Sequence, residues 1–196
     1  MGELEHRVKN TLTVVATVIE RARDNNQSID EFVESLRGRI RSMASTQNLL
    51  SESHWRGSVG LANLIRAELH PYTTSTNTTV EGPAVSLTQT ASHAVAMVFH
   101  ELSTNAAKYG ALSQSGGHVS VRWTLGAEHT SGATLRIEWQ ETGGPEVVVP
   151  VRKGYGTSVI RNLLVYELGG RVDLVYSPGG MRCTIQLPAT GSTMAA

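Results

Sequence analysis

Cysteine is nearly absent from this sequence of 196 residues, and neither charge is in excess. The single cysteine, Cys183, excludes an internal disulfide framework and any zinc cluster built on cysteines. The 17 Lys and Arg residues balance 17 Asp and Glu residues, whereas a protein that coats nucleic acid or anionic membranes needs a basic surplus. No apolar run reaches the ~18 residues of a membrane span, and no signal peptide is visible. We therefore expect no membrane span in this chain and a reducing, cytoplasmic location.

Proline and glycine are unevenly distributed along the chain. Residues 3–69 contain no proline and three glycines, whereas the remainder holds all six prolines and most of the 19 glycines. Because both residue types interrupt helices, this contrast predicts a helical N-terminal part and a mixed C-terminal part. We set the domains at residues 1–58 and 59–190, followed by a flexible tail at 191–196.

The N-terminal part contains two stretches in which apolar residues recur at helical spacing. The first covers residues 3–23, and the second begins at a capping box, Ser28 to Glu31. The second apolar stripe consists of Phe32, Leu36, Ile40, Met43 and Leu50. Two amphipathic helices joined by a short turn form an antiparallel hairpin, and two hairpins bury far more apolar surface as a four-helix bundle. We therefore expect a homodimer that forms through the hairpin.

The C-terminal part alternates helices with strands. Helices are expected at 61–69, 88–109 and 157–168, and strands at 78–81, 85–87, 119–125, 134–139, 172–176 and 182–187. Strands that pair as hairpins between helices predict an α+β fold with helices on one face of a mixed sheet.

His6, on the first predicted helix, is the first residue of chemical interest. It lies opposite the apolar stripe of that helix, so we do not interpret it as a packed core histidine. An exposed imidazole is largely neutral at pH 7 and leaves one ring nitrogen free as a nucleophile. A lone histidine on a helix is, however, more often only a polar surface residue.

Glu101, Asn105 and Lys108 follow one another at spacings of four and three on the helix expected at 88–109. This spacing places all three on one side of the helix. The carboxylate and the amide oxygen suit Mg²⁺, and the ammonium group suits phosphate. A solvated helix edge commonly has the same composition, so spacing alone leaves both interpretations open.

Two glycine clusters follow in the sequence. Gly143 and Gly144 come after the strand expected at 134–139, and Gly154 and Gly156 stand just before Thr157 and the last predicted helix. Glycine lets the backbone approach a ligand closely, and the free N–H groups at the start of a helix favour phosphate. Each cluster taken singly is equally consistent with an ordinary turn.

Together and in this order, the motifs resemble the core of a sensor histidine kinase of the HWE subfamily. His6 to Asn10 is similar to the phospho-acceptor box, and His100 to Gly110 is similar to the asparagine box. Trp139 to Pro145 and Gly154 to Thr157 are similar to the first and second glycine boxes. The resemblance covers nearly the whole chain, although Glu5 stands where we expect Asn.

The resemblance implies a helical hairpin for dimerisation and phosphotransfer, followed by a Bergerat-type α/β sandwich that binds ATP with Mg²⁺. It implies that His6 accepts the γ-phosphoryl group and that Glu101 orients or deprotonates its imidazole. Asn105 would ligate Mg²⁺, and Lys108 would contact the phosphates. Because His6 and the ATP site lie in different domains, we expect a hinge at residues 51–60.

The resemblance also assigns the glycine boxes. Glu141 would accept a hydrogen bond from the adenine amino group, and the backbone of Gly143 and Gly144 would let the base approach. The second box would contact the phosphates through Gly154, Gly156 and Thr157. Trp139 would pack beneath the adenine, and the resemblance assigns no task to His100, which we interpret as a polar packing residue.

The implied partner is the receiver domain of a response regulator, which would take the phosphoryl group on an aspartate. Because only five residues precede His6, we expect the upstream sensor domain of such kinases to be absent from this chain. Three alternatives remain open: a histidine phosphotransfer protein with a degenerate ATP site, a non-enzymatic dimerisation and docking scaffold, and a serine kinase of the anti-sigma type. Residues 1–50 argue against the last, because such kinases lack an acceptor hairpin.

Overall fold

The chain divides into two units, Met1–Ile40 and Arg41–Ala196, and the division falls inside one helix, α2, at Ile29–Glu52. The computed structural model describes residues 29–52, 58–74, 76–128, 132–147, 155–188 and 192–194. The second predicted helix is confirmed as α2, whereas the first, at residues 3–23, lies outside the described residues. The domain boundary expected after residue 58 stays a prediction.

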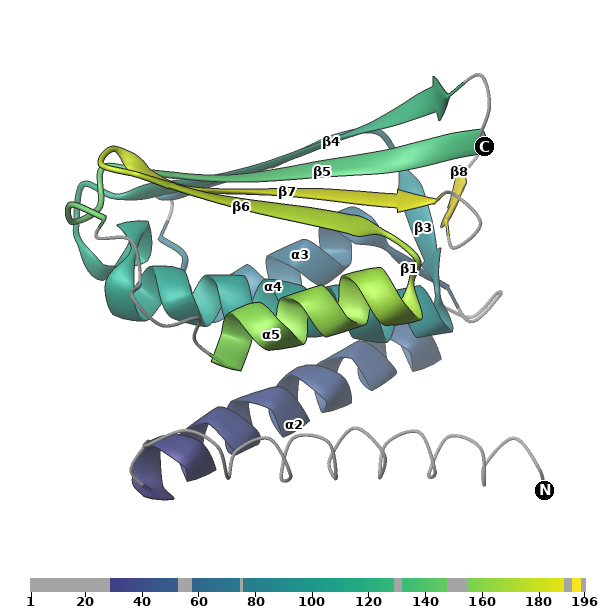
Figure 1. The fold of residues 1–196 in the computed structure, drawn as a ribbon. Helices are drawn as coiled ribbons and strands as arrows, with labels where there is room; N and C mark the ends of the chain where they lie inside the picture. The colour runs from purple at the N-terminus through teal and green to yellow at the C-terminus, as the bar shows by residue number, and fades with distance from the viewer. Residues whose placement is uncertain are drawn as a thin grey trace. The chain divides into compact units, whose positions relative to one another are not determined.

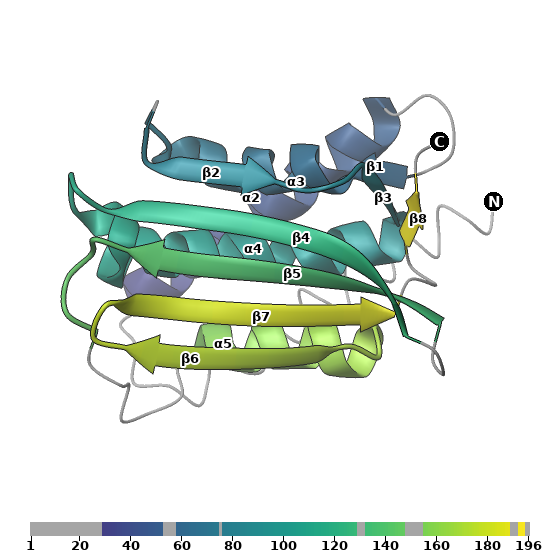
Figure 2. The same cartoon turned by 90° about the horizontal axis from the view of Figure 1, so that it is seen from above.

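The second unit is built on a five-stranded mixed sheet with the strand order β2-β4-β5-β7-β6. The strands are β2 Thr78–Glu81, β4 His118–Glu128, β5 Gly132–Thr142, β6 Arg171–Ser177 and β7 Gly180–Pro188. β2 runs parallel to β4, and the other neighbours are antiparallel (Figure 2). All five strands match segments predicted from the sequence, and alternation of apolar and polar residues was the signal for β4 and β5.

Helices cover one face of this sheet (Figure 1). They are α3 Leu61–Leu69, α4 Gln89–Tyr109 and α5 Tyr155–Arg161, which continues as a π-helix, η3, at Asn162–Glu167. Two short 3₁₀ turns follow α3 and α4, η1 at His70–Tyr72 and η2 at Ala111–Ser113. The predicted α+β class, with helices on one face of a mixed sheet, is therefore confirmed.

The core lies between the inner face of the sheet and the helices. Alternate residues of three strands point inward and are buried: Val119, Val121, Trp123, Leu135, Ile137, Trp139, Cys183, Ile185 and Leu187. α4 contributes apolar residues to this core, including Val95, Val98 and Leu102. Six consecutive residues of α4, 94–99, are buried, so this helix is fixed within the core.

The ends of α4 follow from local sequence. The Thr88 hydroxyl accepts a hydrogen bond from the Ala91 N–H at 3.4 Å and caps the first turn. At the other end, the Gly110 N–H donates to the carbonyls of Asn105 and Ala106 at 3.2 and 3.1 Å. The helix therefore stops directly before the turn that adjoins the candidate site.

A second, three-stranded sheet was only partly predicted. It has the order β1-β3-β8, with β1 Ser58–Gly60, β3 Val85–Thr88 and β8 Ser192–Met194. β1 lies within the hinge expected at residues 51–60 and β8 within the tail expected at 191–196, and both expectations stay predictions. Both strands pair antiparallel with β3, and backbone pairing along a strand edge leaves little trace in side-chain composition.

The last helix also differs from the prediction. The segment expected as one helix at 157–168 changes to π-helical hydrogen bonding at Asn162. The Leu168 N–H donates to the Leu163 carbonyl at 3.2 Å, and the Gly170 N–H reaches the Leu164 carbonyl at 2.8 Å. Gly169, with φ of 62°, ends the helix as its sequence predicts.

Candidate functional site

Three residues of the asparagine box, Glu101, Asn105 and Lys108, lie on the second half of α4. Glu101 is buried with 6% of its surface exposed, Asn105 is half-buried, and Lys108 is exposed on the last turn. The row therefore runs from the protein interior toward solvent. A carboxylate, an amide and an ammonium group in this order can serve a ligand that enters from the open end.

Gly156, at the start of α5, lies directly against this row. A Cβ atom built on Gly156 would stand 2.7 Å from Oε2 of Glu101 and 3.5 Å from Nδ2 of Asn105. Thr157, the next residue, is half-buried. Tertiary folding thus brings part of the second glycine box onto the asparagine box.

Glu141 lies at the C-terminal end of α4. Its Oε2 accepts a hydrogen bond from the Ala111 N–H at 2.8 Å, and its Oε1 accepts one from the Trp139 indole at 3.0 Å. Burial raises the pKa of Glu141, while the hydrogen bonds from Ala111 and Trp139 oppose that rise. The carboxylate thus ties the end of β5 to the turn that follows α4.

Three glycines lie beside Glu141 and the turn after α4, at positions where the Cβ atom of any other residue would collide with a neighbour. A Cβ on Gly110 would collide with Oε2 of Glu141, and one on Gly144 would stand 2.7 Å from the Ala111 Cα. Gly143 has φ of 68°, a conformation that favours glycine, and its Cβ would collide with the Gly116 carbonyl oxygen. The first glycine box therefore lies flat against the turn after α4.

Trp139 supports the site from below. Its side chain is fully buried, and its ring lies 6.0 Å from that of Phe99, centroid to centroid, at an angle of 56°. Its indole N–H donates to Glu141. The sequence predicted a packing role for Trp139, but not that Gly110, Ala111 and Gly116 would build the wall beside Glu141. The Gly116-Gly117 pair was the available signal for that turn.

Two predicted site residues, His6 and Gly154, lie outside the described residues. The other eight lie on α4, at the start of α5 or around the end of β5. The structure shows contact between Gly156 and the row of Glu101 and Asn105, and between Glu141 and the turn after α4. A half-buried amide with a bare glycine cradle fits a nucleotide whose phosphates carry a divalent cation.

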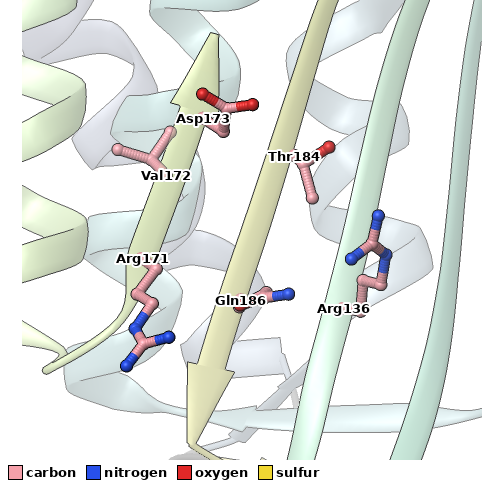
Figure 3. Close-up of a pocket in the computed structure, with 6 residues that line it drawn as sticks. All are labelled: Arg136, Arg171, Val172, Asp173, Thr184 and Gln186. Carbon is pink, nitrogen blue, oxygen red and sulfur yellow. The ribbon is translucent and has the colours of Figure 1, made fainter.

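A cavity of about 380 Å³ lies elsewhere, along strands β5, β6 and β7 (Figure 3). It is lined by Arg136, Arg171, Val172, Asp173, Thr184 and Gln186. Arg136 is already paired with Glu138 at 2.8 Å. No predicted site residue that the structure describes lines this cavity. Of the helices in the described part of the chain, none is long and apolar enough to cross a membrane.

The fold of the chain is the one seen in solved histidine kinase structures. The chain is similar in structure to the blue-light activated histidine kinase EL346 of Erythrobacter litoralis, with a TM-score of 0.70 and 18% identity over 95% of this chain and 58% of that one. The separate histidine kinase domain of that protein gives a TM-score of 0.66 and 16% identity, covering 92% of this chain and 84% of that domain.

Sequence comparison finds similar proteins of one family. Residues 3–84 match the family described as HWE histidine kinase. The chain is 29% identical over 193 residues, or 98% of its length, to a blue-light-activated histidine kinase of Rhizobium johnstonii. It is 26% identical over 96% of its length to one of Brucella ovis. It spans 54% and 38% of these relatives. The chain is therefore similar to HWE histidine kinases in residues 3–84 and to these two kinases over nearly its whole length.

Proposed function

We propose that this chain is a kinase core that transfers the γ-phosphoryl group of ATP to His6 and then to an aspartate of a response regulator receiver domain. The observation that carries the proposal is the contact of Gly156 with Glu101 and Asn105 on α4. The same helix leads directly into the turn held by Glu141. Residues on α4 and in the turn that follows it can therefore contact both the adenine and the phosphates of one nucleotide.

Glu141, Gly143 and Gly144 would receive the adenine. Each carboxylate oxygen has a second lone pair, so Glu141 can accept a hydrogen bond from the adenine amino group while it keeps its bonds to Ala111 and Trp139. Those two bonds fix the carboxylate before the ligand arrives. The glycines leave their backbone bare beside it.

Asn105, Lys108 and the second glycine box would receive the phosphates. Asn105 would hold Mg²⁺, which supplies neutralisation of phosphate charge when bound. Lys108 is exposed at the open end of the row and can reach phosphate oxygens. Gly154, Gly156 and Thr157 would contact the phosphates at the start of α5.

The transfer itself needs little covalent chemistry from the protein. A ring nitrogen of His6 attacks the γ-phosphorus in line, and the bond from that phosphorus to the ADP oxygen breaks. Glu101 orients the imidazole and takes its proton. Phosphoryl transfer passes through a loose transition state, so alignment and charge neutralisation carry most of the catalysis.

Two associations belong to this proposal. The first is a homodimer through the helical hairpin of residues 1–58. Ile40, on the predicted apolar stripe of α2, is 48% exposed in the single chain, which supports a partner surface there. The second is a receiver domain that docks on the face of the first predicted helix with Asn10, Thr13 and Thr17.

Incubation with γ-labelled ATP and Mg²⁺, followed by mapping of the labelled residue, tests the proposed function. We expect acid-labile label on His6, and His6→Ala should abolish it while nucleotide affinity stays unchanged. Label on a serine would contradict the proposal. A chain that accepts phosphate only from a partner would be a phosphotransfer protein, and one that neither binds ATP nor labels would be a scaffold.

A further inference from the structure

Glu68, a buried carboxylate on α3, joins three helices. Its Oε1 accepts a hydrogen bond from the Ser42 hydroxyl of α2 at 2.7 Å, and its Oε2 lies 3.3 Å from Nδ1 of His100 on α4. Only 6% of the Glu68 side chain and 13% of the His100 side chain are exposed. Ser42 is also buried. These three residues form what we call the Ser42–Glu68–His100 bridge.

The bridge consists of polar groups where apolar side chains could also pack. Leu50 of α2, Leu64 of α3 and Val98 of α4 already belong to one apolar core. Burying a carboxylate is costly, and well-packed apolar replacements of buried ion pairs are often neutral or stabilising. Hydrogen bonds constrain distance and direction, which apolar contacts do not. The bridge thus gives the part of α2 around Ser42 a defined place against α3 and α4.

One end of the bridge lies beside the candidate catalytic residues. His100 directly precedes Glu101, and successive residues of a helix are about 100° apart around its axis. α4 runs between α3 and α5 (Figure 2), so His100 faces Glu68 on one side while Glu101 faces Gly156 on the other. The same turn of α4 thus contacts α3 through His100 and the start of α5 through Glu101.

The other end of the bridge lies on α2. Ser42 is in the second unit, and α2 begins at Ile29, so the helix continues from the part of the chain that contains His6. The bridge therefore joins the helix that follows the acceptor segment to the helix that carries Glu101 and Asn105.

We propose that Glu68 and His100 are positioning residues for phosphoryl transfer, which hold α2 in a defined place against α4. The inference rests on the proposed kinase function. Neither side chain is assigned a contact with the nucleotide, so loss of the bridge should slow the transfer and leave ATP affinity intact. A misplacement of about 1 Å can cost about a hundredfold in rate when alignment carries the catalysis.

Variants of the full chain separate positioning from folding. His100→Leu removes the ring nitrogen, whereas His100→Asn keeps an N–H donor at the same distance from the backbone as Nδ1. Ser92→Ala is the matched control, because Ser92 is buried on the same helix and its hydroxyl donates to the Thr88 carbonyl at 2.8 Å, outside the bridge. For each variant, the rate of His6 labelling at saturating ATP, the Kd for ATP and the Tm are measured.

We expect His100→Leu to slow labelling by about tenfold or more with a change in Kd below about twofold. His100→Asn should restore most of the rate, and Ser92→Ala should keep the wild-type rate whatever its Tm. An unchanged rate in His100→Leu, or a parallel loss of rate and affinity, would overturn the inference.

If His100→Leu does not fold, Ser42→Ala replaces it, because this change removes only a hydroxyl from the other end of the bridge. A slower rate with unchanged Kd supports the inference, and a wild-type rate overturns it. A wild-type chain that binds ATP without labelling His6 refutes the proposed function, and with it the role of the bridge in that function. If the wild type labels His6 and the bridge variants label it at the same rate, the positioning role of the bridge is refuted and the proposed function is not.

Discussion

Gly156 lies against the carboxylate of Glu101, so that a Cβ atom on the glycine would stand 2.7 Å from Oε2. The two residues come from α5 and α4, which the whole β4–β5 hairpin separates in the sequence. Their contact joins the second glycine box to the asparagine box. The site is thus an outcome of helix packing on the sheet rather than of any one segment.

Gly156→Ala should impair the site while the fold persists. The added methyl group must displace the Glu101 carboxylate, and a shift of about 1 Å there should slow His6 labelling about 10- to 100-fold. Labelling kinetics with γ-labelled ATP measure this. Gly179→Ala is the control, because a Cβ at Gly179, in the β6–β7 turn, would meet nothing within 4 Å. Equal rates in the two variants would contradict the assignment.

Asn105→Ala should abolish the Mg²⁺-dependent part of ATP binding. The amide oxygen is the proposed protein ligand of the cation, and alanine offers none. Calorimetric titration with ATP, in Mg²⁺ and in a chelator, gives the two affinities. Asn105→Asp tests the same position with a charged oxygen, and we expect it also to lose this binding. Unchanged affinity in both variants would show that Asn105 does not hold the cation.

Glu141→Gln should change how stability depends on pH. Burial raises the pKa of Glu141 in the folded chain, so the folded state binds its proton more tightly than the unfolded state does. The stability this group contributes is therefore full below the ordinary glutamate pKa of about 4.3 and is lost as pH rises through the raised value. Denaturant unfolding of both proteins from about pH 4 to pH 8 measures the difference in unfolding free energy.

That difference, wild type minus Glu141→Gln, should fall as pH rises. In the variant, the glutamine NH₂ group must face one of two N–H donors, that of Ala111 or that of the Trp139 indole. That donor loses its acceptor, which costs about 1–3 kcal/mol of stability at any pH. A difference that grows with pH would show that the hydrogen bonds outweigh burial.

Cys183 should be inert in the folded chain. It is fully buried on β7, and burial, followed by the charge of Asp173, raises the pKa of its thiol to about 12. Since the thiolate is the reactive form, a thiol reagent at pH 8 should label the native protein very slowly. Because the chain has one cysteine, labelling in denaturant should reach one equivalent and serves as the control. Rapid native labelling would mean that this part of the sheet opens.

Local sequence was enough for most elements of the second unit. Thr88 caps α4, Gly110 ends it, and alternating apolar residues mark β4, β5 and β7, because each signal acts over a few neighbouring residues. The sequence did not predict β1 and β8, since both form by backbone pairing with β3, whose partners are remote in the chain. The π-helical turns after Arg161 also escaped prediction, because their hydrogen bonds depend on how the helix ends at Gly169.

The sequence by itself determined the motifs, their order and the side of α4 on which Glu101 and Asn105 stand, because helical periodicity is a local property. The tertiary structure alone decided which partners those side chains meet. Gly156 contacts Glu101, Ala111 bonds to Glu141, and Glu68 lies beside His100, because packing of helices on the sheet brings segments that are distant in the sequence into contact. No spacing rule along the chain encodes those contacts. His100 is an example, because the sequence indicated only a polar packing residue and the structure places it against the buried carboxylate of Glu68.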